Sequence, residues 1–422
     1  MNTFTSNTFS AYIGIDWADS KHDICLQAAN EAKRKFSVIE HKVDKIDEWV
    51  ESLLKQYKAP IAIAIELSKG PIINALQKYD CFVIFPINPS TLATYRLAFK
   101  SSRAKNDPGD AELALDLLIR HPERFNALTP QSAEIRALSS LVEARRNLVD
   151  DKNRLTNRLR ASLKQYYPQT LEWFDRIDTH LFCNFITRWP TLLQAKRARQ
   201  NTLIKFFLEN HMRFPKVIEK RLTAIKKASP LTNDEAVIIP HRLQSLNLVA
   251  QIHVILDAIE QYDSEIERIA KQQADYELFN SLPGTGSALT PRLMVAFGEQ
   301  RERFQSAAEM QMYSGIAPVT EQSGKKQWIH WRWQCPTFLR QTFVEWAGQT
   351  INKSIWADAY YHQQRSKGCT HQTALRSLAF KWIRIVYHCW KTQTPYDELL
   401  YLKALKQRGS TLLNPISLPK SC

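Results

Sequence analysis

The sequence AYIGIDWADSKHDICL, residues 11–26, contains an apolar run, a short polar turn and a second apolar run. This pattern predicts two strands joined by a turn. Asp16 stands at the end of the first run, where a sheet holds a carboxylate rigidly while its oxygens face solvent. Asp19 and Asp23 are weaker candidates for a functional role, and Asp19 falls in the turn, where its side chain commonly bonds the backbone.

Two later stretches add acidic residues of the same kind. Residues 61–66 read IAIAIE, a second apolar run that ends in an acid, Glu66. Asp107 and Asp110 lie three residues apart at the start of a helical pattern, so both project from one helix face. Carboxylate oxygens suit Mg²⁺ or Mn²⁺. Two such ions can flank a phosphodiester. The predicted metal ligands are Asp16, Glu66, Asp107 and Asp110.

The first 120 residues alternate between strand-like and helical patterns. The predicted strands are 12–16, 23–29, 61–66 and 82–86. The predicted helices are 44–57, 70–79, 90–99 and 108–120. A hairpin followed by alternating helix and strand indicates a mixed α/β sheet with covered faces.

The middle of the chain is predicted to be helical. Residues 131–167 carry apolar residues at spacings of three, four and seven with cations between them, which predicts a long amphipathic helix with coiled-coil character and a basic outer face. Residues 250–273 predict a second such helix, able to pair antiparallel with the first. We assign no catalysis to this region, including the helical stretch 168–250. Its candidate nucleic-acid contacts are Arg145, Arg146, Arg154 and Arg158.

The last third is predicted to form a compact, mainly helical domain over 278–405. Residues 282–290 read LPGTGSALT, a glycine-rich turn that leads into a helix. Gly284 and Gly286 would expose backbone N–H groups there, a suitable seat for one phosphate. The turn resembles those of helix-hairpin-helix modules. It lacks the spacing of a nucleotide P-loop and of the dinucleotide-binding fingerprint.

Two serines precede glycines in this domain. Ser323 lies in the polar sequence QSGKK, where neighbouring cations could offset developing charge. A serine hydroxyl can attack a phosphodiester and keep the bond energy as a phosphoserine, which suits rejoining of DNA. Ser314 follows a more apolar stretch and is the second choice. A Ser-Gly pair is most often a simple turn, so that alternative stays open for both.

The charge of the chain predicts a polyanionic partner. There are 57 Lys and Arg against 42 Asp and Glu, a net charge of +15. Many cations on one surface gain from phosphate neutralisation and counterion release. A basic protein without such a partner is the alternative. The remaining candidate phosphate contacts are Arg96, Lys100, Arg103, Lys105, Lys325, Lys326, Arg332 and Arg340.

Cysteine usage predicts a reducing compartment. The seven cysteines are scattered and include no CxxC pair, which favours reduced thiols in the cytoplasm. The histidines and cysteines of the last third lack zinc-finger spacing. The N-terminus shows no signal peptide. No apolar run approaches the length of about 20 residues that a membrane span requires, so we expect no membrane partner.

In combination, these motifs resemble those of the DEDD transposases of the insertion-sequence 110 family, which are bridge-RNA-guided recombinases. The four acids match the family's acids in order, with Asn106 where the family has Thr. The C-terminal signature matches Pro283–Gly286, Gly315–Pro318 and Ser323-Gly324. The resemblance covers 11–120 and 278–395. Two departures are a longer spacer at 168–250 and the tract HWRW at 330–333 where the family has a His-Gly stretch.

The resemblance implies a multidomain α/β plus α chain. Residues 11–125 would form a RuvC-like domain of RNase H fold, 126–277 a helical coiled-coil spacer, and 278–405 the transposase domain with its catalytic serine. The expected flanks are a flexible tail at 1–10 and a disordered tail at 406–422.

The resemblance also implies an insertion-sequence transposase that cuts and rejoins DNA. Ser323 would form a transient covalent link to DNA, and the acids would bind two Mg²⁺ or Mn²⁺ ions in a composite site between subunits. A structured non-coding guide RNA encoded by the element would pair with donor and target DNA. The chain would work as a homo-oligomer, a dimer or a tetramer, in a prokaryotic cytoplasm in association with the nucleoid.

Three alternatives remain at this stage. A Holliday-junction or structure-specific endonuclease would use only the acids. An actin- or hexokinase-like ATPase would need a Gly/Thr-rich phosphate loop after Asp16, whereas residues 17–22 read WADSKH. A non-enzymatic nucleic-acid scaffold would need neither the acids nor the serine.

Overall fold

The computed structural model describes residues 9–57, 60–99, 107–324, 326–410 and 412. Most of the predicted tails, and the predicted phosphate contacts Lys100, Arg103, Lys105 and Lys325, lie outside these residues. The chain divides into two compact units, Met1–Pro130 and Gln131–Cys422, called unit 1 and unit 2 below. The predicted spacer and transposase domain therefore share one unit.

Unit 1 contains a five-stranded sheet that is mixed, as predicted, but has one strand more than the four predicted from the sequence. Its strands are β1 (Ala11–Trp17), β2 (Lys21–Ala28), β3 (Arg34–Glu40), β4 (Ile61–Ile65) and β5 (Phe82–Pro86). The sheet order is β3-β2-β1-β4-β5, antiparallel from β3 to β1 and parallel from β1 to β5. The helices are α1 (Val43–Gln56), α2 (Pro71–Leu76), α3 (Pro89–Phe99), α4 (Asp107–Arg120) and the 3₁₀ helix η1 (Pro122–Arg124).

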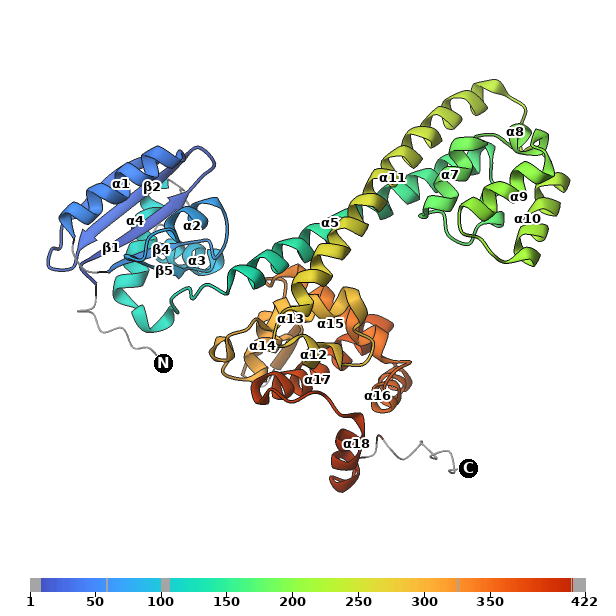
Figure 1. Cartoon of the computed structure of the whole chain (residues 1–422). Coiled ribbons are helices and arrows are strands. Elements are labelled where there is room, and N and C mark those ends of the chain that lie inside the picture. Colours follow the sequence, from blue (N-terminus) through green and yellow to red (C-terminus); the bar gives the residue numbers. More distant parts are fainter. Residues whose placement is uncertain (1–8, 58–59, 100–106, 325, 411, 413–422) are drawn as a thin grey trace. The chain divides into compact units, whose positions relative to one another are not determined.

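Helices cover both faces of this sheet (Figure 1). Alternation along β4 sends Ile61, Ile63 and Ile65 into one core with apolar residues of α1 and α2. Ala62 and Ala64 point the opposite way, into a core with apolar residues of α4. Burial on both faces explains why β4 is apolar at every position.

Two features of unit 1 differ from the sequence prediction. Strand β3 was not predicted, because apart from Ile39 its side chains are not buried and show no apolar alternation. It is held by the antiparallel ladder with β2. Phe9, placed by the sequence in a flexible tail, is buried and packs edge-on against Phe85. Packing of Phe9 removes its apolar surface from water, which stabilises the folded position over an exposed one.

Unit 2 is mostly helical. Its longer helices are α5 (Ala133–Tyr166), α7 (His180–Arg188), α9 (Gln200–Glu209), α10 (Pro215–Lys227), α11 (Glu235–Lys271), α13 (Gly286–Phe297), α15 (Thr337–Thr350), α16 (Ile355–Ser366), α17 (His371–Thr392) and α18 (Glu398–Gln407). The shorter elements are α6 (Thr170–Trp173), α8 (Leu192–Arg197), α12 (Tyr276–Asn280), η2 (Arg301–Arg303), α14 (Ala307–Tyr313), β6 (Val319–Ser323) and β7 (Lys326–His330).

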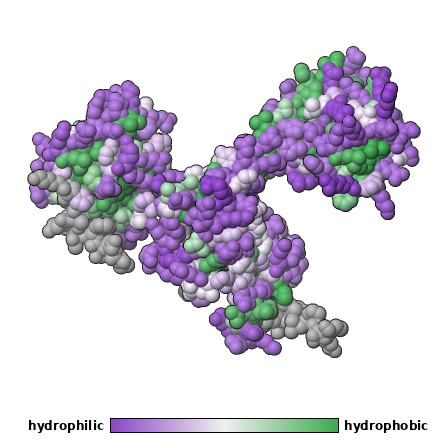
Figure 2. Space-filling model, in the orientation of Figure 1, coloured by the Kyte–Doolittle hydropathy of each residue, from purple (hydrophilic) through white to green (hydrophobic). Residues whose placement is uncertain are grey.

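The two longest helices, α5 and α11, pack side by side (Figure 1). Their contacts run antiparallel, as predicted, since Arg145 bonds Asp263 while Ser162 bonds Ser245. One end of the pair joins a core with α6 to α10, the middle lobe, and the other end joins a core with α12 to α18, the C-terminal lobe. Figure 2 shows hydrophobic patches on the otherwise mostly hydrophilic middle lobe.

Helix α11 begins at Glu235, well before the predicted start at residue 250. The sequence prediction was wrong here because Pro240 suggests a break. Pro240 instead lies within the second turn of the helix, where Val237 and Ile238 pack against the core of the middle lobe. Among the described residues, no helix is both long and apolar enough to span a membrane.

Candidate active site

Two of the predicted acids lie at the same edge of the sheet in unit 1. Asp16 is near the end of β1, and Glu66 directly follows β4. The two strands are parallel neighbours in a register that places Ile15 beside Ile65. Asp16 and Glu66 are therefore the next positions along two adjacent strands, and a sheet holds such positions close together.

Helix α4 brings a third acid to this edge. A Cβ built at Gly14 would lie 2.0 Å from the Ala111 carbonyl oxygen, so only glycine lets α4 approach β1 this closely. Strand alternation directs the side chain of Asp16 toward the same face as Gly14. Asp110 immediately precedes Ala111, and it is 2% exposed. The packing of α4 on β1 thus sets the position of Asp110 relative to Asp16.

Asp110 is paired with an arginine from α3. Arg96 Nε donates to Asp110 Oδ1 at 2.7 Å, and Arg96 Nη2 lies 2.7 Å from Oδ2. Although Oδ2 is near this cation, it accepts no hydrogen bond among the described residues. Arg96, predicted as a phosphate contact, is committed to Asp110 in this conformation.

The carboxylate chemistry of this edge fits a hard divalent cation, and the buried Oδ2 of Asp110 has a lone pair to offer. Among the described residues, however, no three His, Cys, Asp or Glu side chains form a group that could hold a metal ion. The side chain of Asp107 lies outside the described residues. Buried Asp23 is paired with Asp16 across the β1–β2 ladder. From the sequence, Asp23 was only a weaker candidate for a functional role.

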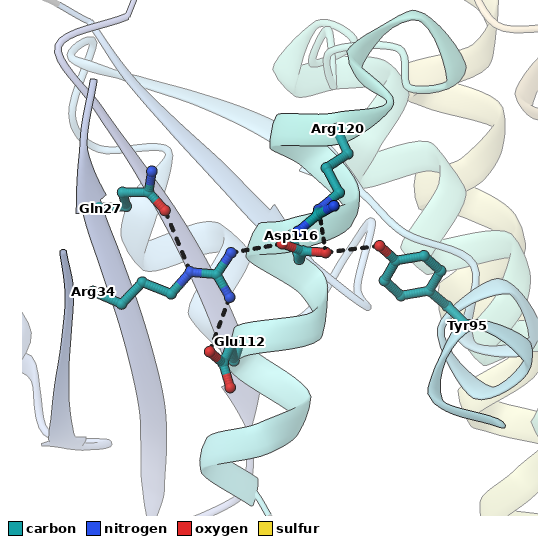
Figure 3. Close-up of polar contacts among 6 residues, drawn as sticks. All are labelled: Gln27, Arg34, Tyr95, Glu112, Asp116 and Arg120. Atoms are coloured by element: carbon teal, nitrogen blue, oxygen red, sulfur yellow. Dashed lines mark hydrogen bonds and ion pairs between the residues drawn. The ribbon is translucent and has the colours of Figure 1, made fainter. Parts of the chain in front are cut away.

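A polar network fixes α4 against the sheet and α3 (Figure 3). Arg34 of β3 donates to Glu112 at 2.9 Å and to Asp116 at 2.6 Å. Tyr95 of α3 donates to Asp116 Oδ2 at 2.7 Å, and Arg120 lies 2.8 Å from the same oxygen.

These partners also change the ionisation of Asp116. Burial acts to raise the pKa of Asp116, but the hydrogen bonds from Tyr95, Arg34 and Arg120 outweigh it and the pKa is lowered. The contacts of this network were not predicted from the sequence. Acids four residues apart on α4 were visible, but their partner Arg34 comes from a strand that was not predicted.

Ser323 is the last residue of β6, on a two-stranded hairpin. It is paired with Lys326 at the start of β7, across a turn in which Gly324 has φ +58°. Paired residues of an antiparallel ladder project from the same face, so the ammonium of Lys326 can lie near the hydroxyl. Ser323 and Lys326 are exposed. The prediction of a mainly helical domain did not include this hairpin, because its strands have no buried apolar face.

Ser314 occupies a different environment. It follows α14, is fully buried, and its Oγ donates to the Gln311 carbonyl oxygen at 3.3 Å. Its backbone N–H donates to Met310. A phosphodiester could reach this hydroxyl only if the end of α14 opened.

The predicted cations of unit 2 fall into two groups. Arg145 bonds Asp263 of α11, and Arg146 lies 2.9 Å from Glu345 of α15, so both serve contacts between helices. Arg154 and Arg158 lie on the exposed side of α5, although Arg154 pairs with its neighbour Asp151. The second pair remains accessible to a polyanion.

The cations after the hairpin are structural in part. Arg332 Nε donates to the Ala317 carbonyl oxygen at 3.1 Å, which ties the end of the hairpin to its beginning. Arg340 Nη1 donates to the Arg332 carbonyl oxygen at 3.0 Å. These bonds hold the loop after β7.

The glycine-rich turn lies between α12 and α13. Gly284 has φ +76°, and a Cβ there would lie 2.8 Å from the Gln349 carbonyl oxygen, so glycine is needed for packing. Gly286 has φ +55°, and a Cβ there would meet no described atom within 4 Å. Only the Gly286 side of the turn is open to a ligand such as a phosphate.

Comparison with known proteins gives two family matches. Residues 13–168 match a model for the DEDD transposase of IS110, described as a transposase. Residues 276–362 match the transposase IS116/IS110/IS902 family. The first range includes the strand-end acids and α4, and the second includes the glycine-rich turn and the hairpin.

Several curated proteins are similar over most of their length. A mini-circle protein of Streptomyces coelicolor, named for a transposase of IS117, is 28% identical over 93% of this chain and 96% of its own. The 44.8 kDa protein of insertion element IS116 from Streptomyces clavuligerus is 25% identical over 89% of this chain and 93% of its own. The 43.6 kDa protein of insertion element IS110 from Streptomyces coelicolor is 26% identical over 72% of this chain and 76% of its own.

Proposed function

Because this chain belongs to the IS110 family of transposases, we propose that it cuts and rejoins DNA through Ser323, assisted by the carboxylates of unit 1. The observation that carries the proposal is that Asp16 and Glu66 occupy neighbouring strand ends, while Asp110 lies on α4 where this helix packs on β1 at Gly14. Rigidly held acids at strand ends suit phosphodiester chemistry.

In the proposed reaction, Ser323 Oγ attacks a phosphorus atom of DNA. One P–O bond forms to the serine and one P–O bond to a deoxyribose oxygen breaks, while the serine hydroxyl loses its proton and the departing oxygen gains one. A hydroxyl of a second strand then attacks the phosphoserine and restores a phosphodiester. Because each step exchanges one phosphate ester for another, no energy-rich cofactor is required.

Lys326 supports the serine electrostatically in this proposal. Its ammonium faces the same side of the hairpin as Ser323 and would offset charge that develops on the phosphoryl oxygens. Ser314 is disfavoured because it is buried and already bonded to the backbone.

Asp16, Glu66, Asp107 and Asp110 would hold one or two Mg²⁺ or Mn²⁺ ions. When bound, the ions would neutralise phosphodiester charge and stabilise the attacking or departing oxygen. The fit rests on the oxygen-only donor set and on the buried Oδ2 of Asp110, which is ion-paired with Arg96 but accepts no hydrogen bond among the described residues. Arg96 would have to release Asp110 before both carboxylate oxygens of Asp110 could coordinate a metal ion.

A structured guide RNA that pairs with donor and target DNA, and assembly as a homo-oligomer, complete the proposal. They rest on family membership and on the excess of 57 cationic over 42 acidic residues. The exposed Arg154 and Arg158 are candidate backbone contacts for either nucleic acid.

The test is formation of the excised circular junction in cells, measured by PCR with the gene expressed inside its native flanks. Ser323→Ala and Asp16→Ala should abolish the junction. Ser314→Ala is the matched serine control and should retain it. Expression of all variants is checked in parallel.

A denaturing gel of protein with labelled DNA gives a second readout. A covalent adduct should form with wild type and disappear with Ser323→Ala. Cleavage that persists without an adduct in Ser323→Ala would instead favour an endonuclease that uses only the acids. A junction that survives Ser323→Ala but not Ser314→Ala would show that Ser314, and not Ser323, is the nucleophile.

A further inference from the structure

The loop that follows the serine hairpin carries a strongly exposed tryptophan. Trp333 lies between β7 and α15, and it is 80% exposed. Tryptophan has a large apolar surface and is enriched at interfaces, and an exposed apolar patch such as Trp328, Ile329 and Trp333 form along this segment can mark a binding site. The adjacent strand β7 also exposes Ile329, at 71%, which provides an aliphatic residue for comparison.

The base of this loop is held firmly. Trp331 is contacted by two guanidinium groups, with Arg376 3.7 Å and Arg340 4.8 Å from its ring centre. These arginines come from α17 and α15, two helices of the C-terminal lobe core. The rings of Trp331 and Trp333 lie 6.3 Å apart. The exposed Trp333 therefore adjoins a base in which aromatic and cationic side chains contact one another.

We propose that Trp333 stacks against an unpaired base of the DNA strand that Ser323 attacks. This inference rests on the proposed function of Ser323. Base–aromatic stacking tolerates any sequence because every base has a π face. Only an unpaired base can offer that face fully, since the bases of a duplex cover one another. Strand exchange creates such unpaired bases beside the cut.

Charge on the surrounding chain favours a nucleic acid as the occupant. From residue 319 to 340 the sequence has one acid, Glu321, and four Lys and Arg residues. A positively charged groove combined with exposed rings is the usual arrangement for single-stranded nucleic acids. An uncharged protein surface would not need this excess of cations.

The hairpin also limits how closely Trp333 can approach Ser323. His330 is paired with Val319, four residues before Ser323, so Trp333 lies beyond the base of the hairpin while Ser323 lies at its tip. Four residues of strand span about 14 Å. At ~3.4 Å per nucleotide of a stacked strand, the hairpin alone spans about four nucleotides, so the stacked base would not be the one next to the attacked phosphate.

The experiment measures binding by the full chain that carries Ser323→Ala, so that no covalent link forms. The probes are a fluorescent oligothymidylate, an oligouridylate, and an abasic oligomer of the same length and charge. Adding Trp333→Ala should weaken oligothymidylate binding ~10-fold, within a range of roughly 5- to 150-fold expected for loss of one stacking contact. Binding of the abasic oligomer should not change. Trp333→Phe should restore part of the loss, and Ile329→Ala is the matched control.

Four results would overturn the proposal. Equal weakening for both oligomers would show that Trp333 supports the loop or its cations. Unchanged oligothymidylate binding would exclude a stacking contact with DNA, and a loss seen only with oligouridylate would assign the contact to RNA. A change in oligomeric mass caused by Trp333→Ala would indicate a protein partner. The assay does not need Ser323, so an adduct that survives Ser323→Ala would refute the nucleophile assignment separately.

Discussion

Replacement of Gly14 by alanine should displace α4 from the sheet. The added Cβ would lie 2.0 Å from the Ala111 carbonyl oxygen and 2.7 Å from the Leu115 nitrogen, both backbone atoms that cannot rotate away. Unstrained contacts between heavy atoms lie at roughly 3–4 Å, so α4 would have to move by about 1 Å or more. Overpacking of this kind costs about 1–3 kcal/mol.

The same displacement should reduce activity. Asp110 moves with α4, whereas Asp16 stays with β1. A misplacement of about 1 Å can cost ~100-fold in rate. We expect Gly14→Ala to lower the yield of excised circular junction by about two orders of magnitude, measured by quantitative PCR at equal protein levels. Urea denaturation followed by circular dichroism, with hydrogen exchange of α4 and β1, reports the stability of unit 1.

The matched control is Gly348→Ala in α15. There the new Cβ would lie 3.8 Å from a Leu375 methyl group, an ordinary contact. Alanine favours a helix over glycine by up to about 1 kcal/mol, so this variant should be neutral or slightly more stable. Wild-type stability and junction yield in Gly14→Ala would refute the argument that this glycine sets the position of Asp110. So would an equal loss in Gly348→Ala.

Three further predictions concern stability. Burial, and repulsion from nearby His41, lower the pKa of His22 to about 4. The pKa of a histidine in the unfolded chain is about 6.5, so the native state binds fewer protons than the unfolded state between pH 6.5 and 4. The free energy of unfolding of unit 1 should therefore fall by about 1–3 kcal/mol over this pH range. In urea titrations, His22→Leu should make the free energy of unfolding less dependent on pH. Arg292→Met should lower the free energy of unfolding by about 1–3 kcal/mol, because the partly buried Glu345 carboxylate, 2.7 Å from Arg292, loses one cation partner. Adding Glu345→Gln removes the unpaired carboxylate and should recover part of the lost stability in the same urea titration. Asp116→Asn should lower the thermal midpoint, at a cost of about 1–2 kcal/mol, because it weakens the charged contacts that hold α4.

The sequence predicts the layers of unit 1 well because its parallel strands are short and apolar. Residues 61–65 are buried at every position and 82–86 are buried or half-buried, so their apolar composition alone marks them as strands. Edge strand β3 and the β6–β7 hairpin were missed for the opposite reason. Their side chains are mainly exposed, and backbone ladders rather than apolar faces define them.

The candidate site shows the same division. Asp16 and Glu66 could be proposed from sequence because each directly ends an apolar run, and neighbouring strand ends meet at one edge. The bond from Arg96 to Asp110 and the position of Asp23 opposite Asp16 could not, since both depend on how separate segments meet. Long-range pairs of this kind carry no local pattern.

The choice between the two serines depends on accessibility, which the sequence left open. A phosphodiester is bulky and charged, so its nucleophile must be reached without burying that charge in an apolar core. Ser314 is fully buried beside Met310 and Gln311, and its hydroxyl already donates to a carbonyl oxygen. Ser323 stands at the end of an exposed strand with Lys326 opposite. Attack by Ser314 would require local unfolding of α14, whereas attack by Ser323 requires no change in the fold of unit 2.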